Sequence, residues 1–421
     1  MANVLGRFTL EESEALLNRL ISLMAEKSLL DRELAVIIDA TDLVVPDDLK
    51  DLDACGTRTR IEKIVGESGR ITEVAVVERG FKLVTLFCQR LRVPLAAKIV
   101  KINDHESQLT MALIEQAKAN LKGRAGIAKI YMDRGFIDGP TLHEIDEMGI
   151  TFVIPSKHTM AVTTDARALA ACGSGRAASR QRTVSKSRGK RRLEAKFNTE
   201  LVGLERLCSY DQYAPDFQDH HRTRKNHCPK PINAVLIRGW EGKCREPGKE
   251  LVFLTNGPVD DPFVVFDDYD ERSLIENTLH RETKQSFSLG ALPKKRANAL
   301  YAQVLCSYAI IYGYRRYMAS KSDSDAALWP PQNPPESQPT TRRAADLRAP
   351  PEPFQGIGMA RWRRQLAAEN ANKVIVFLGI SYGIYDLNEL AALTGIRVKL
   401  TQTERGRIRE VLAQYDIDFS P

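Results

Sequence analysis

Long apolar runs are missing from this 421-residue chain, and cysteine is scarce in it. No window approaches the roughly 18 uninterrupted apolar residues that a membrane-spanning helix needs. Residues 1–20 mix charged and apolar side chains, as a helix does and a signal peptide does not. The seven cysteines are an odd number and lie far apart, which argues against a disulfide framework. We therefore expect a cytoplasmic protein with reduced thiols and no membrane partner.

Two further patterns are absent or incomplete. Gly356-Ile-Gly358 is not followed by the third glycine of a dinucleotide loop, and the chain has no P-loop motif. The cysteine and histidine residues of the 208–244 region lack the paired Cys-x-x-Cys of common zinc sites. These are Cys208, His220, His221, His227, Cys228 and Cys244. A DNA-facing loop is therefore favoured over a zinc site in this region.

Positive charge is concentrated in one part of the chain. Residues 157–249 hold 20 Lys and Arg against 9 Asp and Glu, whereas the whole chain carries +7. The net charge of the insertion is therefore +11, and that of all other residues together is −4. The densest stretch, 173–192, has eight basic residues and no acidic one. We expect a solvated loop there that is either merely soluble or, as we favour, contacts a polyanion through counterion release.

The hydrophobic pattern predicts a mixed sheet with flanking helices. A helix is expected over 9–33, and an apolar run at 34–38 predicts a buried central strand that ends at Asp39. The other expected elements are strands over 71–78, 80–88 and 93–102, a helix over 106–121, a strand over 128–132 before Asp133, a helix over 141–148 and a strand over 151–155. Strands over 250–255 and 263–266 then precede a helix that starts near Tyr269 and reaches Arg315.

Composition shifts divide the chain into segments. They are an N-terminal helical segment (1–33), a first core part (34–156), a basic insertion (157–249), a second core part with the signature helix (250–319), a Pro-rich linker (320–355) and a small αβ appendage (356–421).

Three acidic residues are candidates for metal-dependent chemistry. Cleavage of a phosphodiester needs an activated nucleophile and charge relief on the leaving oxygen, and two divalent ions held by carboxylates supply both. Asp39 and Asp133 each follow an apolar strand, and Glu276 lies one helical turn after Arg272. The alternatives are a capping or turn role for the aspartates, Asp42 in place of Asp39, and a solvent-exposed ion pair at Glu276.

Together these pieces resemble the bacterial insertion-sequence transposases of the DDE superfamily, in the group with a Tyr-Arg-Glu-Lys signature. Tyr269, Arg272 and Glu276 have the spacing of that signature. Asp39-Ala-Thr41 and Asp133-Arg-Gly-Phe136 match its two aspartate segments. Lys284 departs from it, since seven residues rather than six separate it from Glu276, a rotation of about 100° on an α-helix.

The resemblance implies a ribonuclease-H-like fold: a five-stranded mixed sheet flanked by helices, with a mainly β or loop basic subdomain inserted between the second Asp and the Glu. It also implies that Asp39, Asp133 and Glu276 hold two Mg²⁺ ions, for which Mn²⁺ can substitute. The implied partner is double-stranded DNA, as transposon-end inverted repeats and as target, bound by a homodimer near the nucleoid. The residues expected to contact DNA are Tyr269, Arg272, Lys284, Arg188, Lys190, Arg191 and Arg192.

The implied reaction is hydrolysis at the transposon end, followed by attack of the 3′-hydroxyl on target DNA. Two other functions stay open. One is a DNA-binding protein that descends from a transposase and no longer cuts. The other is a nuclease of the same fold that cuts without regard to terminal sequence.

Overall fold

The computed structural model describes residues 9–27, 33–45, 55–65, 71–188, 191–214, 229–240, 243–286, 297–321, 373–378 and 381–386. The chain divides into two compact units, Met1–Glu352 and Pro353–Pro421. The smaller unit contains an antiparallel hairpin of β12 (Lys373–Leu378) and β13 (Ser381–Asp386). The helical part of the expected αβ appendage lies outside the described residues.

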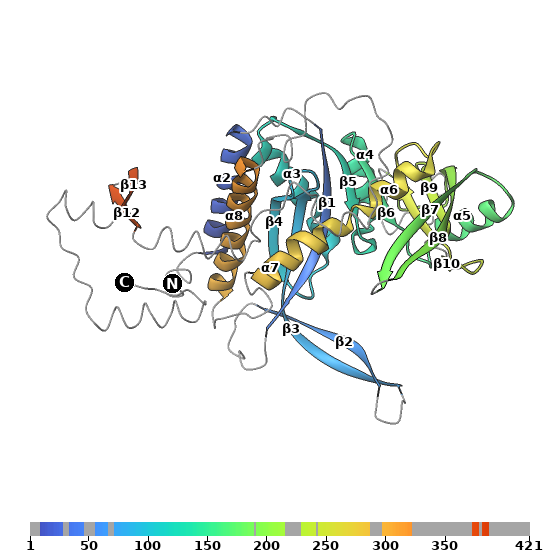
Figure 1. The fold of residues 1–421 in the computed structure, drawn as a ribbon, viewed down its shortest axis with the longest axis horizontal. Coiled ribbons are helices and arrows are strands. Elements are labelled where there is room, and N and C mark those ends of the chain that lie inside the picture. Colours follow the sequence, from blue (N-terminus) through green and yellow to red (C-terminus); the bar gives the residue numbers. More distant parts are fainter. Residues whose placement is uncertain are drawn as a thin grey trace. The chain divides into compact units, whose positions relative to one another are not determined.

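Five strands of the larger unit form the centre of its sheet. They are β1 (Glu33–Val44), β3 (Ile71–Cys88), β4 (Val93–Lys101), β5 (Gly126–Met132) and β6 (Thr151–Pro155). Their spatial order is β4-β3-β1-β5-β6. β1, β3 and β4 are antiparallel neighbours, and β5 and β6 run parallel to β1. This is the ribonuclease-H-like arrangement that the sequence predicted (Figure 1).

The middle of β1 is buried on both faces of the sheet. Val36, Ile37 and Ile38 are consecutive, so they point to alternate faces, yet each is fully buried. A parallel strand with both faces covered reads as a continuous apolar run. For this reason the run at 34–38 is a reliable predictor of the central strand.

Helices cover the sheet. α2 (Leu10–Lys27), α3 (Thr110–Leu121) and α8 (Ala297–Lys321) lie against β4, and α2 contacts both other helices. The shorter helices are η1 (Glu106–Leu109), η2 (Arg134–Phe136), α4 (Gly139–Glu147) and α5 (Ala161–Ala171). Among the helices that the structure describes, none has the length and the apolar content to span a bilayer.

The basic insertion continues the central sheet. β7 (Arg176–Arg188), β8 (Arg191–Leu207), β9 (Ile232–Trp240), β10 (Lys243–Cys244) and β11 (Leu251–Thr255) extend it from β6 in the order β6-β11-β9-β8-β7, and β10 pairs with β9. The loop expected over 173–192 is therefore wrong, because most of this stretch forms the β7–β8 hairpin. Antiparallel pairing satisfies the backbone groups, so this ribbon does not need an apolar core of its own.

A strand predicted at 263–266 is also wrong. These residues belong to α6 (Pro262–Asp270). The Asp261 side chain accepts a hydrogen bond from the Phe263 backbone N–H, and Pro262 takes the first helical position. A cap followed by proline starts a helix and outweighs the strand preference of two valines.

Among the strands that were not predicted is one at the other end of the sheet. β2 (Gly56–Val65) pairs with the first half of β3, whose second half lies within the central sheet. The β2–β3 ribbon projects beyond the sheet, as Figure 1 shows.

A buried hydrogen bond joins α8 to the central sheet and gives a stability prediction. The Thr85 and Tyr308 hydroxyls are 2.7 Å apart, and both residues are completely buried. Tyr308→Phe leaves the Thr85 hydroxyl unpaired, so we expect the free energy of unfolding to fall by about 1–3 kcal/mol. Tyr312→Phe is the matched control, because the buried Tyr312 hydroxyl has no partner among the described residues. Equal losses of stability in denaturant titrations of the two variants would contradict this assignment.

Candidate functional site

Asp39 and Asp133 lie side by side at the centre of the sheet. In the parallel pairing of β1 with β5, Ile38 is opposite Met132, and each aspartate is the next residue of its chain. Asp39 is 8% exposed, whereas Asp133 is half-buried and its Oδ1 accepts a 2.8 Å hydrogen bond from the Arg134 backbone N–H. Asp133 therefore also caps the short helix η2, which is the capping role that the sequence left open for it.

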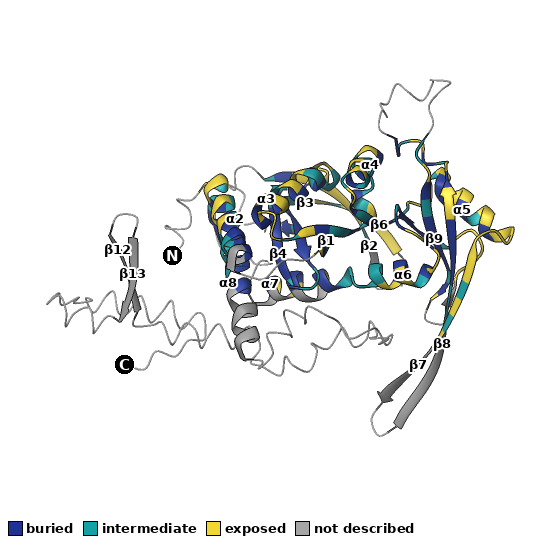
Figure 2. Cartoon of the chain, turned by 90° about the horizontal axis from the view of Figure 1, so that it is seen from above, coloured by how far each residue is buried: buried dark blue, intermediate teal, exposed yellow. Residues whose placement is uncertain are grey.

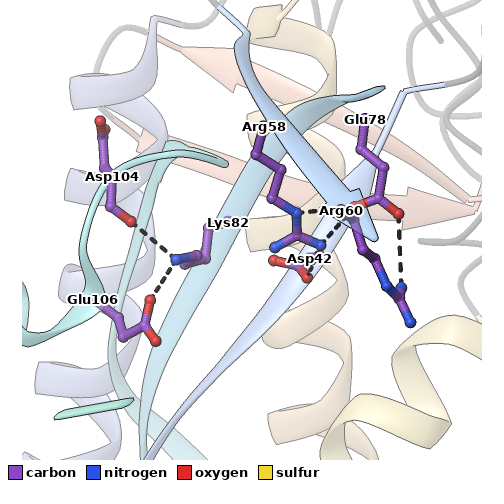
Figure 3. A network of polar contacts seen from close by, with 7 residues as sticks. All are labelled: Asp42, Arg58, Arg60, Glu78, Lys82, Asp104 and Glu106. Carbon is purple, nitrogen blue, oxygen red and sulfur yellow. Dashed lines mark hydrogen bonds and ion pairs between the residues drawn. The ribbon is translucent and has the colours of Figure 1, made fainter. Parts of the chain in front are cut away.

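A side chain in place of Gly135, in the turn after Asp133, would displace a neighbouring carboxylate. The φ angle of Gly135 is not among the positive ones of the described backbone. A Cβ atom on Gly135 would instead lie 2.5 Å from Oε1 of Glu106. Glu106 is held there by Lys82, which also donates a 2.9 Å hydrogen bond to the Asp104 carbonyl (Figure 3).

Asp42, the competing candidate on β1, belongs to a different cluster. Its carboxylate is 2.6 Å from Nη2 of Arg58 on β2, and the same guanidinium contacts Glu78 on β3 (Figure 3). Because Asp39 and Asp42 are three residues apart on a strand, their side chains leave opposite faces of the sheet. The structure therefore separates Asp42 from the other candidate acids.

Arg272 and Glu276 come from the segment that follows α6. Nη2 of Arg272 is 2.9 Å from Oε1 of Glu276, and its Nη1 is 3.6 Å from Oδ1 of Asp39. Burial by itself would lower the pKa of Arg272, but Tyr269, Asp39, Glu276 and Asp133 together raise it above its ordinary value. The structure thus gathers the three candidate acids around one guanidinium.

Tyr269 is packed into the sheet. Its ring centroid is 4.4 Å from that of Phe253 on β11, and the Arg272 guanidinium carbon is 5.8 Å from the ring centroid. Burial raises the pKa of Tyr269, and the negative charges of Asp133 and Asp39 act in the same direction against Arg272. The signature tyrosine therefore borders the acids as a neutral phenol.

A π-helix accounts for the shifted position of Lys284. Residues Ile275–His280 form η4, which has π-helical hydrogen bonding, and α7 (Arg281–Ser286) follows. A π turn contains one residue more than an α turn. It therefore accommodates the additional residue between Glu276 and Lys284 and reduces the rotation expected for a regular α-helix. Lys284 lies exposed on α7.

His280 is a residue of this site that the sequence did not reveal. It is 7% exposed, and its Nε2 lies 3.5 Å from Oδ2 of Asp39. Neither ring nitrogen has a hydrogen-bond partner among the described residues. Its position one α-helical turn after Glu276 is the only signal that a sequence pattern could have offered.

The basic hairpin is anchored to the helix that leads into this site. Nη1 of Arg180 on β7 is 2.8 Å from Oδ2 of Asp267 on α6, and the Arg180 guanidinium lies 4.1 Å from the centroid of the Phe263 ring. Arg188 ends β7 and pairs with Arg191, the first residue of β8, so Arg188, Arg191 and Arg192 lie at the hairpin tip. Lys190 lies outside the described residues. Figure 2 shows the base of this hairpin beside β9, with α5 against β8 and β9.

A divalent ion fits this site by charge and by donor type. Asp39, Asp133 and Glu276 oppose one guanidinium, which leaves an excess of negative charge that is costly where the carboxylates are buried. Within the described residues, however, no three His, Cys, Asp or Glu side chains are already arranged to hold a metal. Arg272 lies among the acids in this state. The same finding gives no support to a zinc site at Cys208, and the other residues of that region have no described side chains.

Comparison with known proteins gives a family match. A family model described as a transposase DDE domain matches residues 31–312, which is about two thirds of the chain. Among solved structures, a cryo-EM structure of the piggyBac transposase synaptic complex with hairpin DNA is similar, with a TM-score of 0.35 and 12% sequence identity. The match covers 88% of this chain and 63% of that one. No curated protein matches the chain.

Glu271, next to Arg272, gives a pH-dependent prediction. Burial, followed by the charges of Asp268, Asp270 and Asp267, raises the pKa of Glu271 to about 7. A raised carboxyl pKa stabilises the folded state below the unfolded pKa, and this contribution is lost as pH rises through 7. Glu271→Gln should therefore stabilise the protein by about 1–2 kcal/mol at pH 8 and have no effect at pH 4.

The measurement is thermal unfolding of both proteins across this pH range. Glu115→Gln, at an exposed position of α3, is the control. A pH-independent difference between wild type and Glu271→Gln would contradict the assignment.

Proposed function

The chain belongs to the family of transposases with a DDE domain, and on that premise we propose that it cuts DNA at transposon ends and joins them to target DNA. The observation that supports the proposal is the parallel register of β1 and β5, in which Asp39 and Asp133 follow residues that lie opposite each other. The charge of Arg272 interacts with both of these aspartates and with Glu276. Three acidic residues with unrelated roles on the surface would have no reason to gather around one arginine. It is what metal-dependent phosphodiester chemistry needs.

Asp39, Asp133 and Glu276 would hold two Mg²⁺ ions, with Mn²⁺ as a substitute. Such ions, when bound, make a nucleophile from water or a 3′-hydroxyl and relieve charge on the leaving oxygen. Hydrolysis leaves a 3′-hydroxyl at the transposon end, and this hydroxyl then attacks a target phosphodiester. The new bond forms as the target 3′-oxygen leaves, so no covalent enzyme intermediate is needed.

The remaining signature residues would position DNA. Arg272 carries a charge that is not needed to balance the acids once cations are bound, and its planar guanidinium suits a phosphate. The Tyr269 ring would limit the space beside the Arg272 guanidinium. Lys284 is exposed on α7 and would contact a neighbouring phosphate.

The basic hairpin would bind the DNA backbone. Arg188, Arg191 and Arg192 lie at its tip, and its base is tied to α6 by the Arg180–Asp267 ion pair. Lys190, which follows in the sequence between Arg188 and Arg191, would contribute a further positive charge. Two DNA ends held by two copies of the chain would complete the complex. A homodimer of this kind is part of the proposal.

Cleavage of labelled DNA tests the proposed reaction. The substrate is a duplex with the inverted repeats that flank the gene, incubated with Mg²⁺ beside a scrambled duplex. We expect cleavage at the repeat boundary, lowered at least about 100-fold in Asp133→Asn and in Asp39→Asn because metal binding supplies several kcal/mol. Asp42→Asn is the matched control on the same strand and should cut normally.

Three outcomes would contradict the proposal. DNA binding without cleavage in wild type would favour the non-catalytic DNA-binding protein. Equal cutting of the scrambled duplex would favour a general nuclease. Loss of activity in Asp42→Asn but not in Asp39→Asn would exchange the roles of the two β1 aspartates.

The salt dependence of DNA binding tests the hairpin. Replacing Arg188, Arg191 and Arg192 with Gln should lower affinity for all duplex sequences alike and reduce the salt slope by about 1 for each phosphate that is no longer neutralised. Lys249→Gln is the control, because Lys249 lies in the same insertion and pairs with Glu246. If the salt dependence of DNA affinity were the same in the triple variant as in the wild type, the hairpin tip would not contact the DNA backbone.

A further inference from the structure

His280 is a buried histidine whose ring nitrogens, Nδ1 and Nε2, have no hydrogen-bond partner among the described residues. The residue is 7% exposed. Each unpaired buried donor or acceptor costs about 1–3 kcal/mol. Buried polar groups are nearly always paired, so the two ring nitrogens of His280 are candidates for binding a ligand at this site.

The spacing between His280 and Asp39 fits a shared ion. Nε2 of His280 and Oδ2 of Asp39 are 3.5 Å apart, which is longer than the usual range of about 2.7–3.2 Å for an N–H···O hydrogen bond. Two ligands at about 2.1 Å from one ion are about 3.0 Å apart in octahedral geometry and about 3.4 Å apart in tetrahedral geometry. The observed separation is close to the tetrahedral value and about 0.5 Å longer than the octahedral value.

The two oxygens of Asp39 face different partners. Arg272 lies near Oδ1 and His280 lies near Oδ2. A cation beside Oδ2 would therefore sit on the side of the carboxylate away from the guanidinium. His280 is the last residue of the π-helical segment that also carries Glu276, and π turns recur at functional sites.

We propose that His280 supplies, through Nε2, a nitrogen ligand to the divalent ion at Asp39, and that the site consequently prefers Mn²⁺ to Mg²⁺. The presence of an ion at Asp39 rests on the proposed function; the nitrogen ligand rests on His280 itself. Imidazole is a ligand of transition metals, whereas Mg²⁺ prefers oxygen donors and retains its waters. A site formed by carboxylates alone would discriminate less between the two ions.

Pulsed EPR of Mn²⁺ bound to the full chain tests the ligand directly. With one equivalent of MnCl₂, we expect a ¹⁴N coupling in the wild-type spectrum that is lost in His280→Gln. His143→Gln is the matched control, since His143 on α4 also lies near a carboxylate, with Nε2 3.9 Å from Glu147. The control should retain the coupling. The wild-type spectrum is informative even if a variant folds poorly.

Calorimetric titration of the same proteins gives the metal preference. His280→Gln should weaken Mn²⁺ binding by at least about tenfold, the size seen when residues that support metal sites are replaced, and weaken Mg²⁺ binding much less. Circular dichroism verifies that the variant is folded.

Several results would overturn the inference. They are bound Mn²⁺ without nitrogen coupling in wild type, coupling that persists in His280→Gln, equal weakening of both ions, or no Mn²⁺ binding. Failure of the proposed function is distinguishable from these. If the protein cleaves transposon ends but bound Mn²⁺ shows no nitrogen coupling, only the role of His280 is refuted. If the coupling is present but no cleavage occurs, only the proposed reaction is refuted.

Discussion

The parallel pairing of β1 with β5 is the constraint on which the site depends. It sets the end of β5 opposite the middle of β1, so that Asp39 and Asp133 follow opposite residues. A shift by one residue would turn one carboxylate to the other face of the sheet. The buried run from Val36 to Ile38 fixes that register because it packs on both faces of the sheet. The same packing that stabilises the centre of the fold therefore brings two acids together, at an electrostatic cost that other residues must offset.

Arg272 offsets part of that cost. It lies between Asp39 and Glu276 and is the cation nearest to both in the described part of the chain. Its position follows from α6, which starts at the Asp261 cap and is tied to the basic hairpin through Arg180. The proposed DNA-binding hairpin and the proposed catalytic acids are thus coupled through one short helix. A phosphate and divalent ions would compete for the groups that now hold each other.

Local patterns predicted the parts of the molecule that local physics determines. Asp39 and Asp133 were singled out because each follows an apolar run, although β1 continues past Asp39 to Val44. The spacing of Arg272 and Glu276 is that of neighbours on one face of a helix. The π turn, which changes where Lys284 lies, has no local signal apart from an extra residue. His280 could not be predicted, because its importance depends on its proximity to a strand more than 200 residues earlier. The prediction of a strand at 263–266 was wrong because the helix cap at Asp261 outweighed the preference of valine for strands.

The most direct test of the central claim is a structure of the chain bound to its own transposon end and Mn²⁺, with the ion located by anomalous scattering. We expect ion density between the carboxylates of Asp39 and Asp133, with the Arg272 guanidinium withdrawn from Asp39 and in contact with a DNA phosphate. An ion bound elsewhere, with Arg272 still between Asp39 and Glu276 on bound DNA, would contradict the proposed catalytic role of these acids.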